Sequence, residues 1–319
     1  MDQVPFAATV NKLIDQIETV IVGKRSVVEM TVIGFLCGGH LLIEDIPGVG
    51  KTMLARSLAR SVDLVFKRIQ FTPDLLPSDV TGVSIYNQST ARFEFRQGPI
   101  FGNVVLADEI NRATPKSQAA LLEAMEEFQV TVDGVAHPLP KPFFVIATEN
   151  PIEYEGTYSL PEAQLDRFLM RLALGYPSAT DEVMILDRQI MQHPIEKVGP
   201  VATAAEILAL QQMVRKVHVD QSLRQYMVAL AGASRRHEAV ELGASPRGSI
   251  ALLRCSQGLA AIRGRGYVTP DDVKDVAEPA LAHRLIMKPQ SRLLGVTPGQ
   301  VVADLLNSVP VPVVEGRRK

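Results

Sequence analysis

Residues 41–58 read LLIEDIPGVGKTMLARSL, and this stretch decides the fold. The apolar residues 41–43 predict a short buried strand, and Leu54 and Leu58, four positions apart, predict the start of a helix. Residues 47–52, PGVGKT, connect these two elements. A glycine-rich turn from a strand into a helix points backbone N–H groups and the helix N-terminus at one spot, which suits a polyphosphate.

The residues that follow the glycines supply the chemistry for a nucleotide. Lys51 would place its charge on the β- and γ-phosphates, and the Thr52 hydroxyl would be a ligand of Mg²⁺. The usual pattern has a glycine five positions before Gly50, where this chain has Asp45. An ordinary turn before a helix is the alternative, but the order strand, loop, helix favours phosphate binding. The candidate binding residues of the loop are Pro47, Gly48, Val49, Gly50, Lys51, Thr52 and Met53.

A second apolar run, residues 103–109 (NVVLADE), ends in two carboxylates. At the end of a buried strand, Asp108 would hold Mg²⁺ directly or through water, and Glu109 would take a proton from an attacking water. Adjacent acids also occur where a helix begins, because the helix dipole favours them there. The phosphate-type loop upstream favours the catalytic interpretation.

A third apolar run, residues 143–151 (FFVIATENP), carries Asn150 at its end. A side-chain amide both donates and accepts hydrogen bonds, so Asn150 is a candidate for orienting the water against the γ-phosphate. The alternative is a turn-forming asparagine before a proline.

Two arginines follow at positions that suit contact with a phosphate. Arg167, in the sequence LDRF, would stabilise the charge that develops on the transferred phosphoryl group of a neighbouring subunit. Arg247 follows Ser245 and Pro246, which predict a helix start, so its charge is fixed on a first turn where it would report the state of the nucleotide. The alternative for Arg167 is a surface ion pair with Asp or Glu, and the alternative for Arg247 is a solvated charge.

The remaining pattern predicts two domains. Apolar strands over residues 64–71, 103–107 and 143–148 alternate with helices, which indicates an α/β fold with a mostly parallel sheet covered by helices. Two hairpins interrupt it, one over residues 83–96 and one over residues 129–137 across Asp133-Gly134. Past residue 177 we expect helices only, with starts at Ser178, Thr203 and Thr269. The expected division is an α/β domain with two hairpin inserts (1–176), a small all-α domain (177–308) and a flexible tail (309–319).

Composition limits the compartment and the partners. In 319 residues, 33 basic side chains nearly balance 35 acidic ones, which argues against a chain that is basic overall and coats nucleic acid. Cys37 and Cys255 lie in apolar segments and are expected to be buried thiols of a reducing compartment. The N-terminus has an acidic Asp2 and lacks a leader pattern, and the longest apolar stretch, 30–43, is too short for a bilayer. We therefore expect a cytoplasmic protein without membrane insertion.

The order of these motifs resembles that of an AAA+ ATPase, which has a P-loop NTPase fold followed by a helical lid. The amino-acid sequence most closely resembles the MoxR family in three segments: EDIPGVGKT (44–52), ADEINRA (107–113) and LPEAQLDRF (160–168). The resemblance extends from about residue 10 to residue 308. It includes the two hairpins, which match the inserts of the helix-2-insert branch and commonly face a central pore there.

The resemblance implies a role for each motif. Lys51 and Thr52 would be Walker A residues, with Asp108 and Glu109 as Walker B. Asn150 would be sensor 1, Arg167 the arginine finger and Arg247 sensor 2. Val22 and Gly23 resemble the segment whose backbone meets the adenine. ATP and Mg²⁺ are the implied cofactors.

The resemblance also implies a ring, usually a hexamer, with a chaperone-like task. Members remodel, activate or mature a protein client, including metal or cofactor insertion, often with a partner that carries a von Willebrand factor A domain. Other functions remain open from the residues. A nucleotide-gated binding module would not need Glu109. A nucleic-acid translocase is disfavoured by the near-neutral charge, although Arg92 and Arg96 lie on the first hairpin. A chelatase-type motor, which shares the same branch of the superfamily, is also an alternative.

Overall fold

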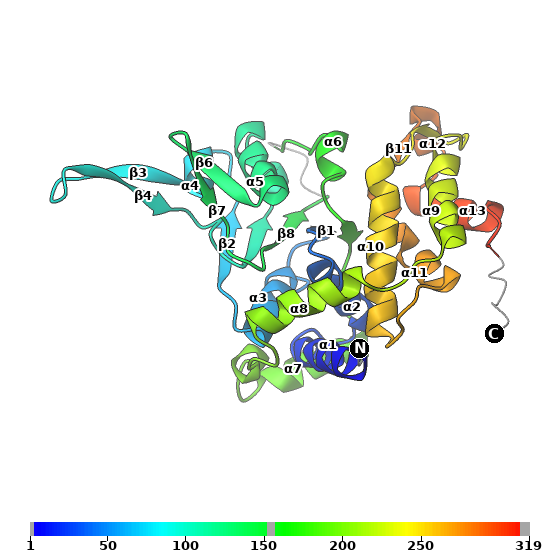
Figure 1. Ribbon diagram of the computed structural model, residues 1–319, viewed down its shortest axis with the longest axis horizontal. Coiled ribbons are helices and arrows are strands. Elements are labelled where there is room, and N and C mark those ends of the chain that lie inside the picture. Colours follow the sequence, from blue (N-terminus) through cyan, green and yellow to red (C-terminus); the bar gives the residue numbers. More distant parts are fainter. Residues whose placement is uncertain (1–2, 152–156, 313–319) are drawn as a thin grey trace. The chain divides into compact units, whose positions relative to one another are not determined.

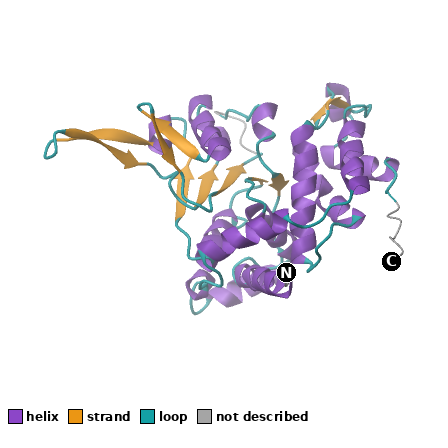
Figure 2. Cartoon of the chain, viewed as in Figure 1, coloured by secondary structure: helices purple, strands orange, loops and turns teal. Residues whose placement is uncertain are grey.

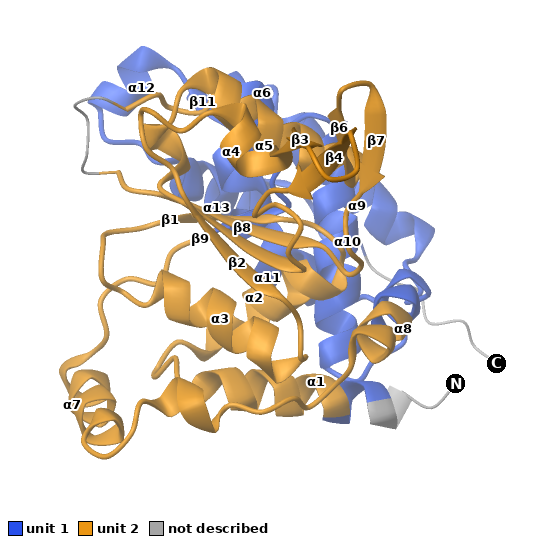
Figure 3. Cartoon of the chain, turned by 90° about the vertical axis from the view of Figure 1, so that its left-hand side faces the viewer, with its two compact units in different colours: residues 1–8, 162–171, 210–319 blue, residues 9–161, 172–209 orange. Residues whose placement is uncertain are grey.

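The computed structural model describes residues 3–151 and 157–312 (Figure 1). The chain divides into two compact units, which are described separately (Figure 3). Unit 2 comprises residues 9–161 and 172–209, and unit 1 comprises the described parts of residues 1–8, 162–171 and 210–319.

A parallel sheet organises unit 2. Among the described residues its strand order is β2-β5-β8-β1-β9, and the chain passes from unit 1 to unit 2 within β9. Pairing is parallel between β1 and β8, between β2 and β5, and between β5 and β8. All five residues of β5 are buried, as expected for a strand covered on both faces. The strands are β1 (Leu41–Glu44), β2 (Phe66–Gln70), β5 (Val104–Asp108), β8 (Phe144–Glu149) and β9 (Met170–Leu172).

Helices cover both faces of this sheet, so the predicted α/β architecture is confirmed. Within unit 2, α1 and α3 lie on one side of the sheet, and α4 and α5 lie on the other (Figure 3). Phe35 of α2 contacts Phe144 of β8, with ring centroids 5.3 Å apart. The helices are α1 (Gln3–Glu18), α2 (Arg25–Leu36), α3 (Lys51–Ser61), α4 (Pro77–Thr81), α5 (Pro115–Glu127), α7 (Ala179–Gln189) and α8 (Ala204–Arg215), with 3-10 turns η1 (Ile110–Arg112) and η2 (Pro194–Lys197).

Both predicted hairpins are present (Figure 2). The first pairs β3 (Gly82–Asn87) with β4 (Arg92–Gln97), and the second pairs β6 (Gln129–Val132) with β7 (Val135–Pro138). Asp133 and Gly134 have φ values of 51° and 77°, as a two-residue hairpin turn requires. Phe95 stacks on His137 at 4.0 Å between ring centroids, so the two hairpins contact each other.

Unit 1 is mostly helical, as predicted for the second domain. The helix starts at Ser245 and Thr269 are confirmed, because each side-chain oxygen accepts a hydrogen bond from a backbone N–H of the first turn. Within residues 3–151 and 157–312, no helix is long and apolar enough to cross a bilayer. The elements are α6 (Glu162–Leu165), α9 (Gln221–Ser234), α10 (Pro246–Ile262), α11 (Pro270–Leu281), η3 (Ala282–Arg284), α12 (Pro289–Leu293) and α13 (Pro298–Ser308).

The expectation that strands end at residue 177 is wrong in one detail. β10 (Val240–Leu242) pairs antiparallel with β11 (Ile286–Met287). Strands of three and two residues are too short to show an alternating pattern, so the sequence did not predict them.

Residues 172–209 belong to unit 2, whereas the sequence placed 177–209 in the second domain. Hydrogen bonds connect residues 172–209 to the earlier residues of unit 2. The Arg188 guanidinium of α7 donates to the backbone oxygens of Glu18 (2.9 Å) and Thr19 (2.7 Å), and the N–H of Val201 donates to the Ser61 oxygen (2.8 Å). Of the predicted tail 309–319, residues 313–319 lie outside the described part of the chain.

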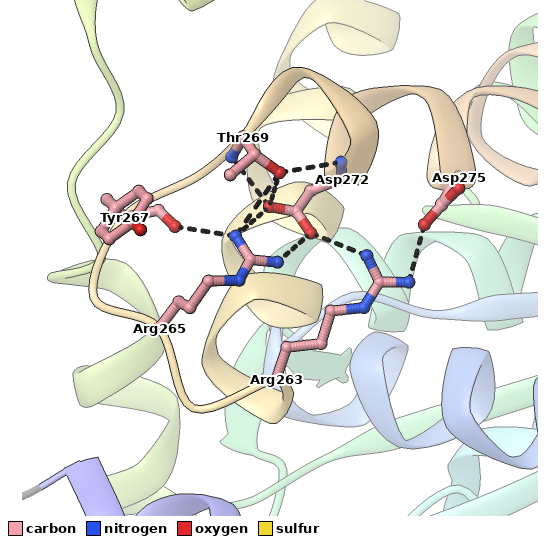
Figure 4. A network of polar contacts seen from close by, with 6 residues as sticks. All are labelled: Arg263, Arg265, Tyr267, Thr269, Asp272 and Asp275. Atoms are coloured by element: carbon pink, nitrogen blue, oxygen red, sulfur yellow. Dashed lines mark hydrogen bonds and ion pairs between the residues drawn. The ribbon is translucent and has the colours of Figure 1, made fainter. Parts of the chain in front are cut away.

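A buried carboxylate fixes the turn between α10 and α11 in unit 1 (Figure 4). Fully buried Asp272 accepts hydrogen bonds from Arg263 (3.0 Å) and Arg265 (2.7 Å), and from the N–H and hydroxyl of Thr269 (both 2.8 Å). Arg263 also donates to Asp275 at 2.7 Å. One side chain therefore holds the loop 263–269 and the first turn of α11 together.

Candidate nucleotide-binding site

The glycine-rich loop lies between β1 and α3, as the sequence predicted. Gly48 and Gly50 have φ values of 84° and 100°, a left-handed backbone that L side chains rarely adopt. Gly50 is the N-cap of α3, so Lys51 is the first residue of the helix. The unpaired N–H groups of this first turn make an anion-binding end.

The Lys51 ammonium is buried beneath the loop. Its Nζ donates to the backbone oxygens of Asp45 (2.6 Å) and Ile46 (3.2 Å). Burial lowers the pKa of Lys51, while the negative charges of Asp45, Asp108 and Glu109 act to raise it. A cation held close to its loop in this way suits a ligand that brings several negative charges.

Asp45 has a structural task that explains the missing glycine. Its Oδ2 accepts from the backbone N–H groups of Leu174 (2.6 Å) and Gly175 (2.7 Å), and its Oδ1 accepts from the N–H of Ile46 (2.9 Å). The carboxylate thus ties the end of β1 to the segment after β9. Sequence reasoning noted the departure from the motif but did not predict this role.

The Walker B-type acids lie at the end of β5, where the sequence placed them. Asp108 Oδ2 accepts from Arg68 Nη2 (2.6 Å) and Nε (3.1 Å). Its Oδ1 accepts from the Thr148 hydroxyl (2.7 Å), and that hydroxyl accepts from the Glu109 N–H (2.8 Å). Thr148 therefore connects the two acids through one oxygen atom.

Glu109 adopts a strained backbone. Its φ of 56° is left-handed, a conformation unusual for a residue with a Cβ. Its Oε2 accepts from Gln70 Nε2 (2.7 Å) and from Arg112 Nη1 (3.0 Å). The half-buried carboxylate is thereby held in one direction.

Arg68, Gln70 and Thr148 were not predicted as site residues. On β2, Arg68 and Gln70 pair in register with Leu106 and Asp108 of β5. The sequence carries a signal, since polar side chains alternate with buried Ile69 toward the end of a strand. This pattern points to the site only once the strand order is known, because that order places β2 beside β5.

A cavity of ≈ 210 Å³ adjoins the loop within unit 2. Of the predicted binding residues it is lined by Val22, Gly48, Val49, Gly50 and Met53. Gly23 packs against α7 instead: its φ is 72°, and a Cβ there would lie 2.3 Å from the Asp181 carboxylate. Lining residues that the sequence did not predict include Lys24, Ile185, Arg188, Gln189, His193 and Pro194.

Asn150 lies directly after β8 in unit 2 and is almost fully buried. Arg167 and Arg247 both lie in unit 1, after α6 and on the first turn of α10. Asp166 connects their segments, since it accepts from the Ser245 hydroxyl (2.8 Å) and from Arg284 Nε (2.8 Å). The roles of these three residues toward a nucleotide stay predictions.

The donor set fits Mg²⁺. This ion prefers oxygen ligands and is usually held by one or two protein groups together with substrate phosphates and water. Asp108 offers carboxylate oxygens at the end of β5, and Thr52 offers a hydroxyl on the first turn of α3. The Arg68 guanidinium is paired with Oδ2 of Asp108, so a metal ion at this oxygen would take the place of the arginine.

Comparisons with known proteins agree with this geometry. The ATPase family associated with various cellular activities matches residues 40–170, and the AAA lid domain matches residues 232–305. A crystal structure of a Cytophaga hutchinsonii protein superposes with a TM-score of 0.92 at 38% identity, covering 98% of this chain and 97% of that one.

Several relatives match nearly the whole chain, and two of them are described here. YeaC of Bacillus subtilis is 52% identical over 302 residues, which are 95% of this chain and 94% of the relative. The chaperone MoxR1 of Mycobacterium tuberculosis is 41% identical over 315 residues, 96% of this chain and 83% of the relative. The loop, the paired acids and these similarities lead to one conclusion: the chain belongs to the MoxR family of AAA+ ATPases.

Proposed function

We propose that this protein is a Mg²⁺-dependent ATP hydrolase that works as a ring-forming motor and remodels, activates or matures a protein client. One observation carries the proposal. The loop with Lys51 follows β1, and Asp108 and Glu109 lie at the end of β5; both strands pair in parallel with β8, so the lysine and the two acids lie at the same edge of one sheet. Charge for a polyphosphate and a base for water are therefore close together.

In the proposed reaction, the loop N–H groups and Lys51 hold the β- and γ-phosphates. Glu109 accepts the proton of the attacking water, and Asn150 orients that water through its amide. Gln70 and Arg112 aim the Glu109 carboxylate through their hydrogen bonds. Bound Mg²⁺, held by Asp108 and Thr52, would neutralise phosphate charge.

The substitution Glu109→Gln tests the chemistry. It keeps the size of the side chain and removes the base, so we expect turnover to fall at least ~100-fold with nucleotide affinity retained. Turnover of ATP and binding of a fluorescent ATP analogue are the measurements. Glu123→Gln, on an exposed position of α5, is the matched control. Turnover that survives Glu109→Gln would refute the role given to Glu109.

The ring, for which a hexamer is proposed, rests on Arg167. If this arginine acts on the nucleotide of a neighbouring subunit, turnover per subunit should rise with protein concentration. Mixing Arg167→Ala subunits with Lys51→Ala subunits should then restore part of the turnover, because each supplies what the other lacks. Mixtures as inactive as the separate variants would contradict shared sites. Arg247→Ala should weaken the response to nucleotide without preventing assembly.

We further propose a cytoplasmic protein client, with a von Willebrand factor A domain protein as a candidate partner. The relative named chaperone MoxR1 supports a chaperone-like task, and the two buried thiols suit a reducing compartment. Stimulation of ATP turnover by such a partner is the test. Tight, salt-dependent binding of nucleic acid would instead favour a translocase.

A further inference from the structure

Helix α7 in unit 2 has two faces with different surroundings. Ile185, Arg188 and Gln189 line the cavity beside the glycine-rich loop, and Arg188 is anchored to the end of α1. The opposite face carries Val183 and Leu186, and Ile190, the C-cap residue of α7, follows on the same side. Figure 3 shows α7 at the margin of unit 2.

The outward face of α7 is apolar and exposed. Val183, Leu186 and Ile190 are spaced three and four residues apart, so they form one stripe along the helix. Ile190 and Met191 directly follow the last residue of α7, and the exposed fractions of these four side chains run from 56% to 92%. We call these four residues the α7 patch. Single exposed apolar residues are ordinary, but an apolar stripe on a helix is typical of a surface that another protein covers.

Unit 1 carries a second exposed apolar group at the end of α12. Leu293 and Leu294 are 88% and 83% exposed and form the α12 patch. The charges beside the two patches are opposite. Asp187 lies within the α7 stripe, whereas the segment 286–296 around the α12 patch contains Lys288 and Arg292 and no acidic residue.

We propose that the α7 patch of one copy of this chain docks on the α12 patch of a second copy. The two patches complement each other: both are apolar, and Asp187 beside the α7 patch is opposite in charge to Lys288 and Arg292 beside the α12 patch. Because the two patches differ, the contact is head-to-tail, the kind that builds rings. This inference rests on the ring assembly proposed above and assigns a surface to it.

Two double variants test the contact in the full chain. Leu186→Asp with Ile190→Asp alters the α7 patch, and Leu293→Asp with Leu294→Asp alters the α12 patch. Placing charges in an apolar contact should weaken association at least ~100-fold for either variant. Sedimentation velocity at micromolar concentration, with a non-hydrolysable ATP analogue, measures the assembly. Val228→Asp, at an exposed apolar position of α9 outside both patches, is the control and should assemble like the unaltered chain.

The decisive measurement is the mixture of the two variants. Each retains the patch that the other has lost, so one intact contact remains, and equimolar mixing should give a 1:1 dimer and no larger species. An α12 variant that still assembles alone would overturn the pairing, as would an unaltered chain that stays monomeric or a mixture without dimers. Analogue binding by each variant separates the two proposals. If dimers form in the mixture but no variant binds nucleotide, the contact stands and the ATPase proposal fails.

Discussion

Two aspartates, Asp272 in unit 1 and Asp108 in unit 2, are buried and paired with arginine, yet their partners differ. Asp272 is held by two arginines and by both donors of Thr269, and its pair with Arg263 and Arg265 lies in a turn (Figure 4). Asp108 has one arginine, Arg68, whose side chain is half exposed, and one hydroxyl. Both oxygens of the Asp272 carboxylate accept hydrogen bonds from neighbouring residues, whereas the arginine partner of Asp108 is half exposed and can move into solvent.

The difference separates a structural carboxylate from a functional one. Burial alone would raise the pKa of Asp272, but hydrogen bonds from Arg265 and Thr269 bring it below its ordinary value. Such a charge is stable only with all its partners in place. A carboxylate with an exchangeable partner can instead accept a metal ion. The following predictions test this comparison, from the largest expected effect to the smallest.

Asp272→Asn should cost about 3 kcal/mol of stability, because it removes the buried charge to which Arg263, Arg265 and Thr269 donate hydrogen bonds. Urea unfolding followed by circular dichroism measures the change. Asp275→Asn removes only an exposed pair of Arg263 and should cost less than about 1 kcal/mol. Equal effects of the two substitutions would contradict the view that Asp272 is the fixed centre.

Acid should destabilise the protein through histidine before it affects Asp272. Buried His40 accepts from the Val145 N–H (3.0 Å) and contacts the Met125 oxygen (3.0 Å), and burial lowers its pKa to about 4. The unfolded chain binds this proton at about pH 6.5, so stability falls by about 3 kcal/mol as the pH drops from 6.5 to 4.

Asp272 also makes the stability depend on pH, but over a lower pH range than His40. Its stabilisation is present above the unfolded pKa of 3.8 and is lost below it.

Because of His40, the free energy of unfolding should decrease as the pH falls from 7 to 4, and His40→Gln should reduce this slope. Buried His283 has a lowered pKa as well, so part of the slope should remain. A slope unaffected by His40→Gln would exclude His40 as its source.

Thr148→Val should reduce ATP turnover about tenfold. The substitution preserves shape but removes the oxygen that connects Asp108 Oδ1 with the Glu109 N–H, which loosens both acids. The loss of two buried hydrogen bonds should also cost about 1–3 kcal/mol of stability. Thr131→Val, at an exposed position of β6, is the control. Normal turnover in Thr148→Val would mean that the strand ends position the acids without this hydroxyl.

Arg68→Ala should lower the Mg²⁺ concentration for half-maximal turnover by up to about fivefold. Arg68 occupies Oδ2 of Asp108, and a half-exposed ion pair of this kind contributes at most about 1 kcal/mol. A Mg²⁺ titration of turnover is the measurement, with Arg60→Ala on α3 as control. A higher Mg²⁺ requirement would show that Arg68 supports the metal instead of competing with it.

Sequence reasoning predicted the elements that carry strong local patterns. The phosphate-type loop, the parallel strands and both hairpins are where the residues indicated. What it missed depends on neighbours distant in sequence: Arg68 matters because β2 lies beside β5, and Ile185 because α7 returns to the loop. The strands β10 and β11 were missed because they are too short for a periodic pattern.

Asp45 gives the phosphate-type loop a mechanical connection. Its backbone oxygen accepts a hydrogen bond from Lys51 Nζ, and its carboxylate accepts from the N–H groups of Leu174 and Gly175. The backbone oxygen of the next residue, Tyr176, accepts a hydrogen bond from Lys24. Strain applied to residues 174–176 is therefore transmitted to Lys51 through a single residue. Asp45 therefore connects the segment that leads to α7 with the cation of the phosphate-type loop.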